Sequence, residues 1–126
     1  MISSENRAQK YVTLLSNGTY MTQADTTREK GAQGLGFRPH ELLEAALASC
    51  MNMSLRMHAQ KLGLSLSKVE VRVTLNRNED AYSTFEYDVA LDETLLPEER
   101  RLLLDALEHS PVRTTLSKPF HFRQKN

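Results

Sequence analysis

The chain has 126 residues, of which 40% are apolar and 25% are charged. This length supports a single hydrophobic core, so we expect one domain over residues 1–126. Sixteen basic residues balance sixteen acidic residues, and a neutral chain lacks the positive field of a nucleic-acid-binding protein. The longest apolar run is four residues, Ala45 to Ala48, which is too short for a transmembrane helix. We therefore expect neither nucleic acid nor a membrane as a partner.

Cys50 is the only cysteine in the chain. A single thiol excludes an internal disulfide framework and a cysteine-based zinc site. The four histidines lack the spacing of a metal motif, so no metal ligand is predicted. The first residues contain no apolar segment typical of a secretory signal. These features favour the reducing cytoplasm as the location of the protein.

The first predicted elements form a hairpin. Residues 10–15 are rich in strand-forming side chains, Asn17-Gly18 favours a tight turn, and residues 20–24 supply the return strand. Residues 25–38 contain three of the five glycines and are predicted to form a loop. A loop of this length is usually either functional or mobile.

Pro39 is predicted to open a long helix that ends at Leu62, with Gly63 stopping it. Between Leu42 and Met53 the helix is apolar or small on nearly every side, which indicates burial on several faces. One short chain can hardly surround such a helix. The small residues would let another helix approach closely, so we infer that a second subunit covers part of it.

The remainder of the chain alternates strands and a helix. Residues 69–75 and 85–91 alternate apolar and polar side chains, which predicts two half-buried antiparallel strands. Pro97 is predicted to start a second helix that ends at Ser110-Pro111, and residues 120–123 are predicted to form a final strand. The resulting order, ββ-α-ββ-α-β, is typical of an α+β domain with antiparallel strands.

Cys50 is the first candidate for chemistry. A lone cysteine on an apolar helix is most often a small buried hydrophobe. A nucleophilic cysteine would need a cation or a protonated histidine nearby to stabilise its thiolate, because its position in the middle of a helix gives it no help from that helix's N-terminus.

Two segments resemble the OsmC/Ohr family. The first runs from Gly34 to Met51 and includes Pro39, the run Glu41-Leu42-Leu43 and Cys50. The second runs from Ser110-Pro111-Val112 to Leu116 and matches the segment that holds the family's second cysteine. The resemblance implies an intertwined homodimer with long central helices. It also implies thiol-based reduction of hydroperoxides, preferably organic ones, without metal or cofactor.

In that family a peroxidatic cysteine becomes a sulfenic acid, a resolving cysteine converts it to a disulfide, and a dithiol reopens the disulfide. Cys50 matches the peroxidatic position. This chain departs from the pattern because Ser110 stands at the resolving position. His40 stands where the best-studied members have the glutamate that holds an activating arginine, and Glu41 follows it. Arg28 and Lys30 lie in the loop where the activating cation is expected.

Three hypotheses follow. The first is a one-Cys hydroperoxide reductase in which an external thiol resolves Cys50, Ser110 donates a hydrogen bond to the sulfur, and Arg28, Lys30 or a histidine lowers the thiol pKa. The second is a non-catalytic module that binds a small apolar ligand or senses redox state. In the third, Cys50 only packs a dimer core. A lowered pKa with solvent access would favour the first hypothesis, whereas full burial would favour the third.

Overall fold

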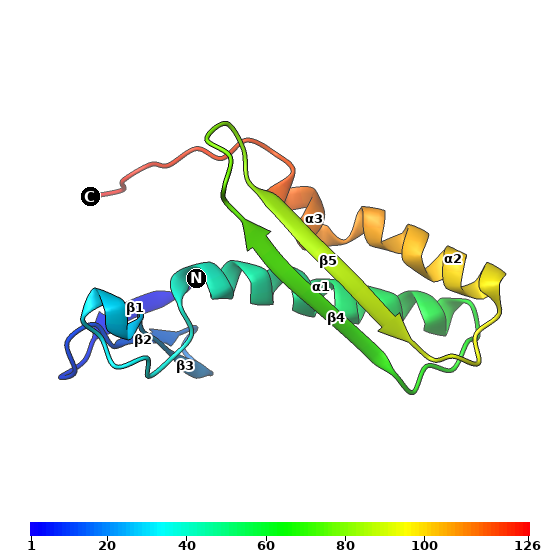
Figure 1. Ribbon diagram of the computed structural model, residues 1–126, viewed down its shortest axis with the longest axis horizontal. Helices are drawn as coiled ribbons and strands as arrows, with labels where there is room; N and C mark the ends of the chain where they lie inside the picture. The colour runs from blue at the N-terminus through cyan, green and yellow to red at the C-terminus, as the bar shows by residue number, and fades with distance from the viewer. The chain divides into compact units, whose positions relative to one another are not determined.

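The computed structural model describes residues 1–126 and confirms an α+β chain with antiparallel strands and a long helix (Figure 1). The chain packs as two compact units, residues 1–44 and 45–126, and the boundary falls within α1. None of the helices is long and apolar enough to cross a membrane. The strands are β1 (Ser3–Asn6), β2 (Thr13–Ser16), β3 (Met21–Ala24), β4 (Val69–Asn76) and β5 (Thr84–Leu91). The helices are η1 (Arg28–Lys30), α1 (Pro39–Lys61), α2 (Pro97–Ala106), η2 (Leu107–His109) and α3 (Pro111–Leu116).

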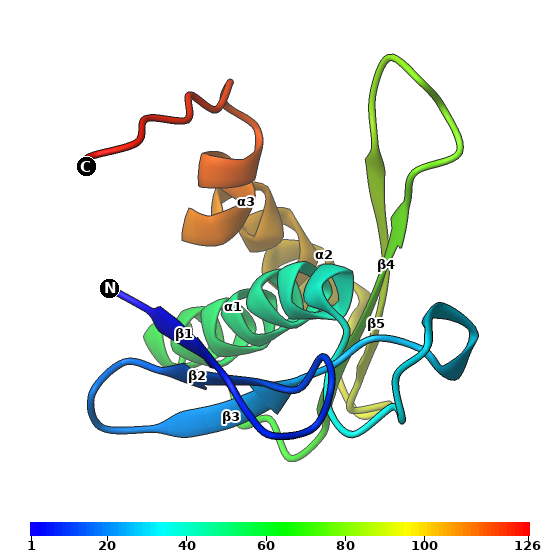
Figure 2. The ribbon, with the colours of Figure 1, turned by 90° about the vertical axis from the view of Figure 1, so that its left-hand side faces the viewer.

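The first unit is built on a three-stranded antiparallel sheet in the order β1-β2-β3 (Figure 2). The predicted hairpin is confirmed, with Ser16 paired to Met21 across the turn. Gly18 takes a φ of +96° at the turn, a conformation that glycine adopts without steric cost. The Asn17 side chain accepts hydrogen bonds from the N–H groups of Thr19 and Tyr20. β1 was not predicted, because its residues are all exposed and show no apolar alternation.

The second unit places helices on one face of the β4–β5 hairpin (Figure 2). β4 and β5 pair in full register from Val69–Leu91 to Asn76–Thr84, as the alternating patterns predict. One stripe of α1 is buried at every fourth residue and forms a core with buried side chains of β5, α2 and η2. The core residues are Leu47, Met51, Leu55, Ala59, Leu91, Leu103 and Leu107. Burial of this stripe explains why α1 lies against the hairpin.

α1 ends at Lys61, one residue before the predicted end at Leu62. Gly63 has a φ of +70°, and the N–H groups of Gly63 and Leu64 donate to the carbonyls of Gln60 and Ala59. This pair of bonds is a Schellman motif, which glycine favours because it lacks a Cβ. The opposite face of α1 is open to solvent in the single chain. Its exposed residues are Ala45, Ala46, Ser49, Met53 and Met57.

The predicted strand at residues 120–123 is wrong. The chain forms no regular structure after α3, and the Phe122 side chain is 96% exposed. Apolar alternation produces a strand only when a neighbouring strand completes its hydrogen bonds, and this segment pairs with no strand of its own chain. Pro111 also does more than end the second helix, since it occupies the first turn of the additional helix α3.

Candidate functional site around Cys50

The site is centred on Cys50 in the middle of α1. Cys50 precedes Met51, a member of the buried stripe, and is therefore half-buried at the edge of the core. The Ser110 hydroxyl donates a hydrogen bond to Cys50 Sγ over 3.1 Å. Ser110 is 1% exposed and lies at the junction between η2 and α3. The fold thus joins two residues that are 60 positions apart in the chain.

Two further hydrogen-bonding groups lower the pKa of the Cys50 thiol. One is the Ser54 hydroxyl, one helical turn after Cys50, and the other is the backbone N–H of Val112. The Val112 N–H belongs to the first turn of α3, where backbone N–H groups have no partner within the helix. Cys50 lies in the middle of α1, away from that helix's N-terminus, and the Val112 N–H in the first turn of α3 is one of the groups that lower the pKa of its thiol.

These contacts decide the ionisation of the thiol. Burial raises the pKa of Cys50, but the hydrogen bonds from Ser110, Val112 and Ser54 lower it, and the net pKa lies below the usual thiol value. A hydrogen bond to the sulfur favours the charged thiolate over the thiol. None of the three donors carries a charge. The thiolate is therefore stabilised by neutral dipoles from within residues 45–126.

Ser110 is the one supporting candidate in the same unit as Cys50. The other four belong to residues 1–44. Arg28 and Lys30 lie on the short helix η1 with exposed side chains, and His40 is exposed at the start of α1.

Glu41 is placed by a local interaction at the start of α1. Its carboxylate accepts hydrogen bonds from the Arg38 backbone N–H over 2.8 Å and from Arg38 Nε over 3.0 Å. The interaction lowers the pKa of Glu41 and raises that of Arg38. A glutamate at the third helical position that reaches back to the N-cap N–H is half of a capping box. Glu41 therefore caps α1 and holds the Arg38 side chain beside it.

Arg38 was not among the predicted site residues. The signal for it is the spacing Arg38-Pro39-His40-Glu41, in which a proline and a glutamate mark the first turn of a helix. α2 begins with the same arrangement, since Glu99 accepts a hydrogen bond from the Leu96 N–H over 2.9 Å. The same Glu41 carboxylate therefore caps α1 and forms an ion pair with the Arg38 side chain.

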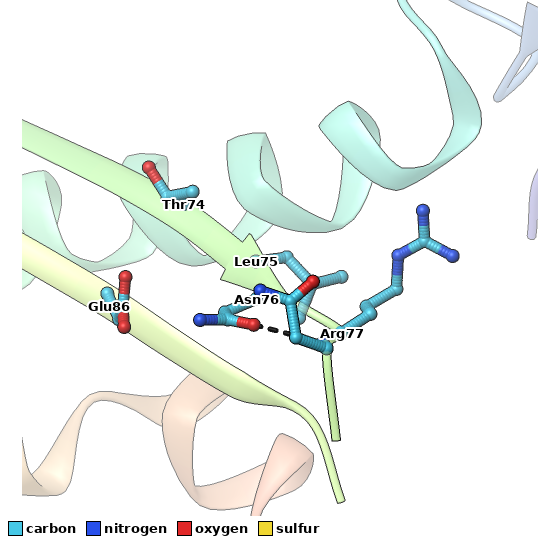
Figure 3. A pocket seen from close by; sticks show the side chains of 6 residues that line it. Thr74, Leu75, Asn76, Arg77 and Glu86 are labelled. Atoms are coloured by element: carbon cyan, nitrogen blue, oxygen red, sulfur yellow. Dashed lines mark hydrogen bonds between the residues drawn. The ribbon is translucent and has the colours of Figure 1, made fainter. Parts of the chain in front are cut away.

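Two surface hollows were not predicted. A polar hollow of about 450 Å³ lies at the turn end of the β4–β5 hairpin (Figure 3). Asn76 accepts a hydrogen bond from the Asn78 N–H there, and the Arg77 side chain extends away from Glu86. This polar hollow is lined by neither cysteine nor histidine, and we assign no reaction to it. A more apolar hollow of about 430 Å³ lies in the first unit; its lining includes Ile2, Leu15, Tyr20, Met21 and Leu42.

Comparison with known proteins identifies the family. The family model described as OsmC-like protein matches residues 31–125. The chain therefore belongs to the OsmC-like family, as the resemblance predicts. A search of curated proteins found no match.

Solved structures share the fold at low sequence identity. An OsmC-like protein from Mycoplasma pneumoniae is 16% identical with a TM-score of 0.71, over 92% of this chain and 85% of that chain. An organic hydroperoxide resistance protein from Legionella pneumophila is 18% identical with a TM-score of 0.64, over 93% and 89%. OhrB of Bacillus subtilis, also an organic hydroperoxide resistance protein, is 18% identical with a TM-score of 0.59, over 94% and 90%.

Proposed function

We propose that this protein is a one-Cys hydroperoxide reductase in which Cys50 is the nucleophile. The observation that carries the proposal is the half-buried Cys50 sulfur, whose pKa is lowered by hydrogen bonds from Ser110, Val112 and Ser54. Membership of the OsmC-like family supports it, as do fold relatives that are hydroperoxide resistance proteins. A lowered pKa with partial exposure favours catalysis over a purely structural cysteine.

The proposed cycle needs no second cysteine. The Cys50 thiolate attacks one oxygen of the hydroperoxide, the O–O bond breaks, and the alkoxide takes a proton and leaves as an alcohol. Cys50 becomes a sulfenic acid. An external thiol then forms a mixed disulfide with Cys50 and releases water. A second thiol, or the second group of a dithiol, releases the Cys50 thiol and leaves the reductant as a disulfide.

Ser110 has the role of a hydrogen-bond donor in this scheme. It occupies the position of the resolving cysteine but cannot form a disulfide. Its hydroxyl stabilises the thiolate before the reaction through the 3.1 Å contact. Arg28, Lys30, His40 and Glu41 remain proposed supporting residues, with Arg28 and Lys30 as sources of positive charge.

Peroxide consumption tests this function. The purified protein is given cumene hydroperoxide or hydrogen peroxide with dithiothreitol or dihydrolipoamide, and intact mass is recorded with a sulfenic-acid trap. We expect faster loss of the organic peroxide, and no turnover by Cys50→Ser. Ser49→Ala is the matched control, because the Ser49 hydroxyl donates only to the Ala46 carbonyl of its own helix. Full activity in Cys50→Ser would disprove the proposal.

We also propose that the protein is a homodimer. The open face of α1 combines small and apolar residues, including Ala45, Ala46 and Met57, which suits close approach by a second helix. The tail segment 120–123 keeps a strand-like alternation, and both of its phenylalanines are exposed. A second copy of the chain would cover both features. Sedimentation equilibrium should show a dimer, and Met57→Glu should weaken it. Arg56→Gln, which changes the net charge by the same one unit at the preceding position, is the comparison.

A non-catalytic module that binds a small apolar ligand is the second candidate. The apolar hollow lined by Ile2, Leu15, Tyr20, Met21 and Leu42 favours it. An unmodified Cys50 after peroxide treatment, together with quenching or enhancement of an apolar dye by this hollow, would support it. The lone thiol still favours a reducing compartment, and we propose the cytoplasm.

A further inference from the structure

Asp25 is a buried carboxylate that the proposed chemistry does not use. It is 3% exposed and directly follows β3, at the start of loop 26–36. Its two oxygens accept hydrogen bonds from the backbone N–H groups of Thr26 over 2.8 Å and Leu35 over 3.0 Å. The nearby N–H groups of Gln33 and Gly34 also help to lower the pKa of Asp25. One side chain therefore binds the backbone at both ends of the loop.

The backbone closes the base of the loop around this carboxylate. The Asp25 N–H donates to the Phe37 carbonyl over 3.0 Å, and the Phe37 N–H donates to the Gln23 carbonyl over 3.1 Å. The Gln23 amide donates to the Leu35 carbonyl over 2.6 Å. The two ends of the loop are thus joined by the backbone, and the Asp25 carboxylate joins them a second time through the N–H groups of Thr26 and Leu35.

The charged side chains of the loop, Arg28, Glu29 and Lys30, lie on the short helix η1. η1 occupies Arg28–Lys30, and its turn is closed by hydrogen bonds from Lys30 to Thr27 and from Gly31 to Arg28. The side chains of Arg28 and Lys30 are exposed. A long loop that is built around an internal anion can hold such cations in one place, which a mobile loop cannot do.

We propose that Asp25 is a positioning residue that holds loop 26–36 in a single conformation. In this way it fixes the positions of the Arg28 and Lys30 side chains. Because an ionised carboxylate accepts hydrogen bonds at both oxygens, it can satisfy the N–H groups of the loop without a water molecule. The effect of these cations on the Cys50 thiolate rests on the proposed function. The ordering of the loop by Asp25 does not.

Limited trypsin digestion of the full chain tests the ordering of the loop. Trypsin cuts after Arg28 and Lys30, and the unstructured tail provides an internal reference at Arg123. In Asp25→Asn we expect cleavage in the loop to rise by about tenfold relative to the tail, since the hydrogen bonds that keep it closed are weakened. Asp92→Asn is the matched control, because Asp92 also accepts backbone N–H groups, from Ser67 and Lys68, in the other unit.

Two further measurements keep the inference falsifiable if the variant folds poorly. In the unaltered protein, the amides of Thr26 and Leu35 should exchange with deuterium more slowly than those of the tail. In Asp25→Ala, added acetate should restore resistance to trypsin at Arg28 and Lys30. Fast exchange at both amides in the unaltered protein, or equal loop cleavage in a folded Asp25→Asn, would overturn the role of Asp25.

The alkylation rate of Cys50 as a function of pH separates this inference from the proposed function. If the loop cations stabilise the thiolate, Asp25→Asn should move the alkylation profile toward higher pH. The double variant Arg28→Ala, Lys30→Ala should move it in the same direction. Adding Asp25→Asn to that double variant should produce no further shift. An opened loop with an unchanged profile would support the role of Asp25 and reject Arg28 and Lys30 as activators.

Discussion

Ser110 donates its hydroxyl hydrogen to Cys50 Sγ over 3.1 Å and so joins the start of α3 to the middle of α1. We propose that Ser110 stands at the position of the family's second cysteine, so that a hydrogen bond takes the place of a disulfide at this site. The chain therefore keeps a donor that stabilises the thiolate but has no internal thiol to resolve a sulfenic acid.

Removing this donor should make Cys50 less acidic. Because the hydrogen bond from Ser110 lowers the pKa of Cys50, Ser110→Ala should raise the pKa and reduce the thiolate fraction at neutral pH. We expect alkylation by iodoacetamide at pH 7 to slow by roughly threefold to tenfold. Its pH profile should move toward higher pH.

Ser117→Ala is the control for that experiment. The Ser117 hydroxyl donates to the Arg113 carbonyl over 2.8 Å and makes a comparable bond within α3. Its removal should leave the Cys50 profile unchanged. An unchanged profile in Ser110→Ala as well would mean that the Val112 N–H and the Ser54 hydroxyl are sufficient to stabilise the thiolate.

Ser110→Cys should restore an internal disulfide. The 3.1 Å separation of Sγ and Oγ is longer than an S–S bond of about 2.05 Å, so only a small side-chain movement is needed. After peroxide treatment the intact mass should fall by two hydrogen atoms, and dithiothreitol should reverse the change. A mass that instead gains oxygen, with the introduced thiol still available to alkylation, would show that the two positions cannot reach bonding geometry.

Leu55→Ala should strongly destabilise the second unit. Leu55 is fully buried in the stripe of α1 that packs on the hairpin, so its truncation removes apolar contacts and leaves a cavity. We expect the free energy of unfolding to fall by about 2–5 kcal/mol in urea denaturation. Met53→Ala on the exposed face should cost less than about 0.5 kcal/mol in the monomer. Equal losses would contradict the assignment of the two faces.

Gly36→Ala should destabilise the first unit for a steric reason. A Cβ at Gly36 would lie 2.3 Å from the Gln23 carbonyl oxygen, which is backbone and cannot rotate away. The substitution should cost about 1–3 kcal/mol in urea denaturation and increase amide exchange at Phe37, whose N–H donates to that carbonyl. Gly63→Ala tests the cost of backbone strain without a clash, since the φ of Gly63 is +70° and nothing lies within 4 Å of the added Cβ.

Local signals predicted most of the elements correctly. Asn17-Gly18 produced its hairpin, and the alternating residues of β4 and β5 produced an antiparallel pair in full register. Pro39 and Gly63 marked the two ends of α1 almost to the residue. These predictions succeed because turn conformations, helix caps and side-chain alternation depend on residues within a few positions of one another.

The sequence by itself determined most of the elements, the single thiol and the family resemblance that singled out Cys50. Only the tertiary structure decided that Ser110, Ser54 and the Val112 N–H stabilise its sulfur, that Asp25 closes loop 26–36, and that residues 120–123 form no strand. The physical reason is the distance along the chain. A pKa, a buried carboxylate and a strand each depend on groups brought together by folding, which local composition does not specify.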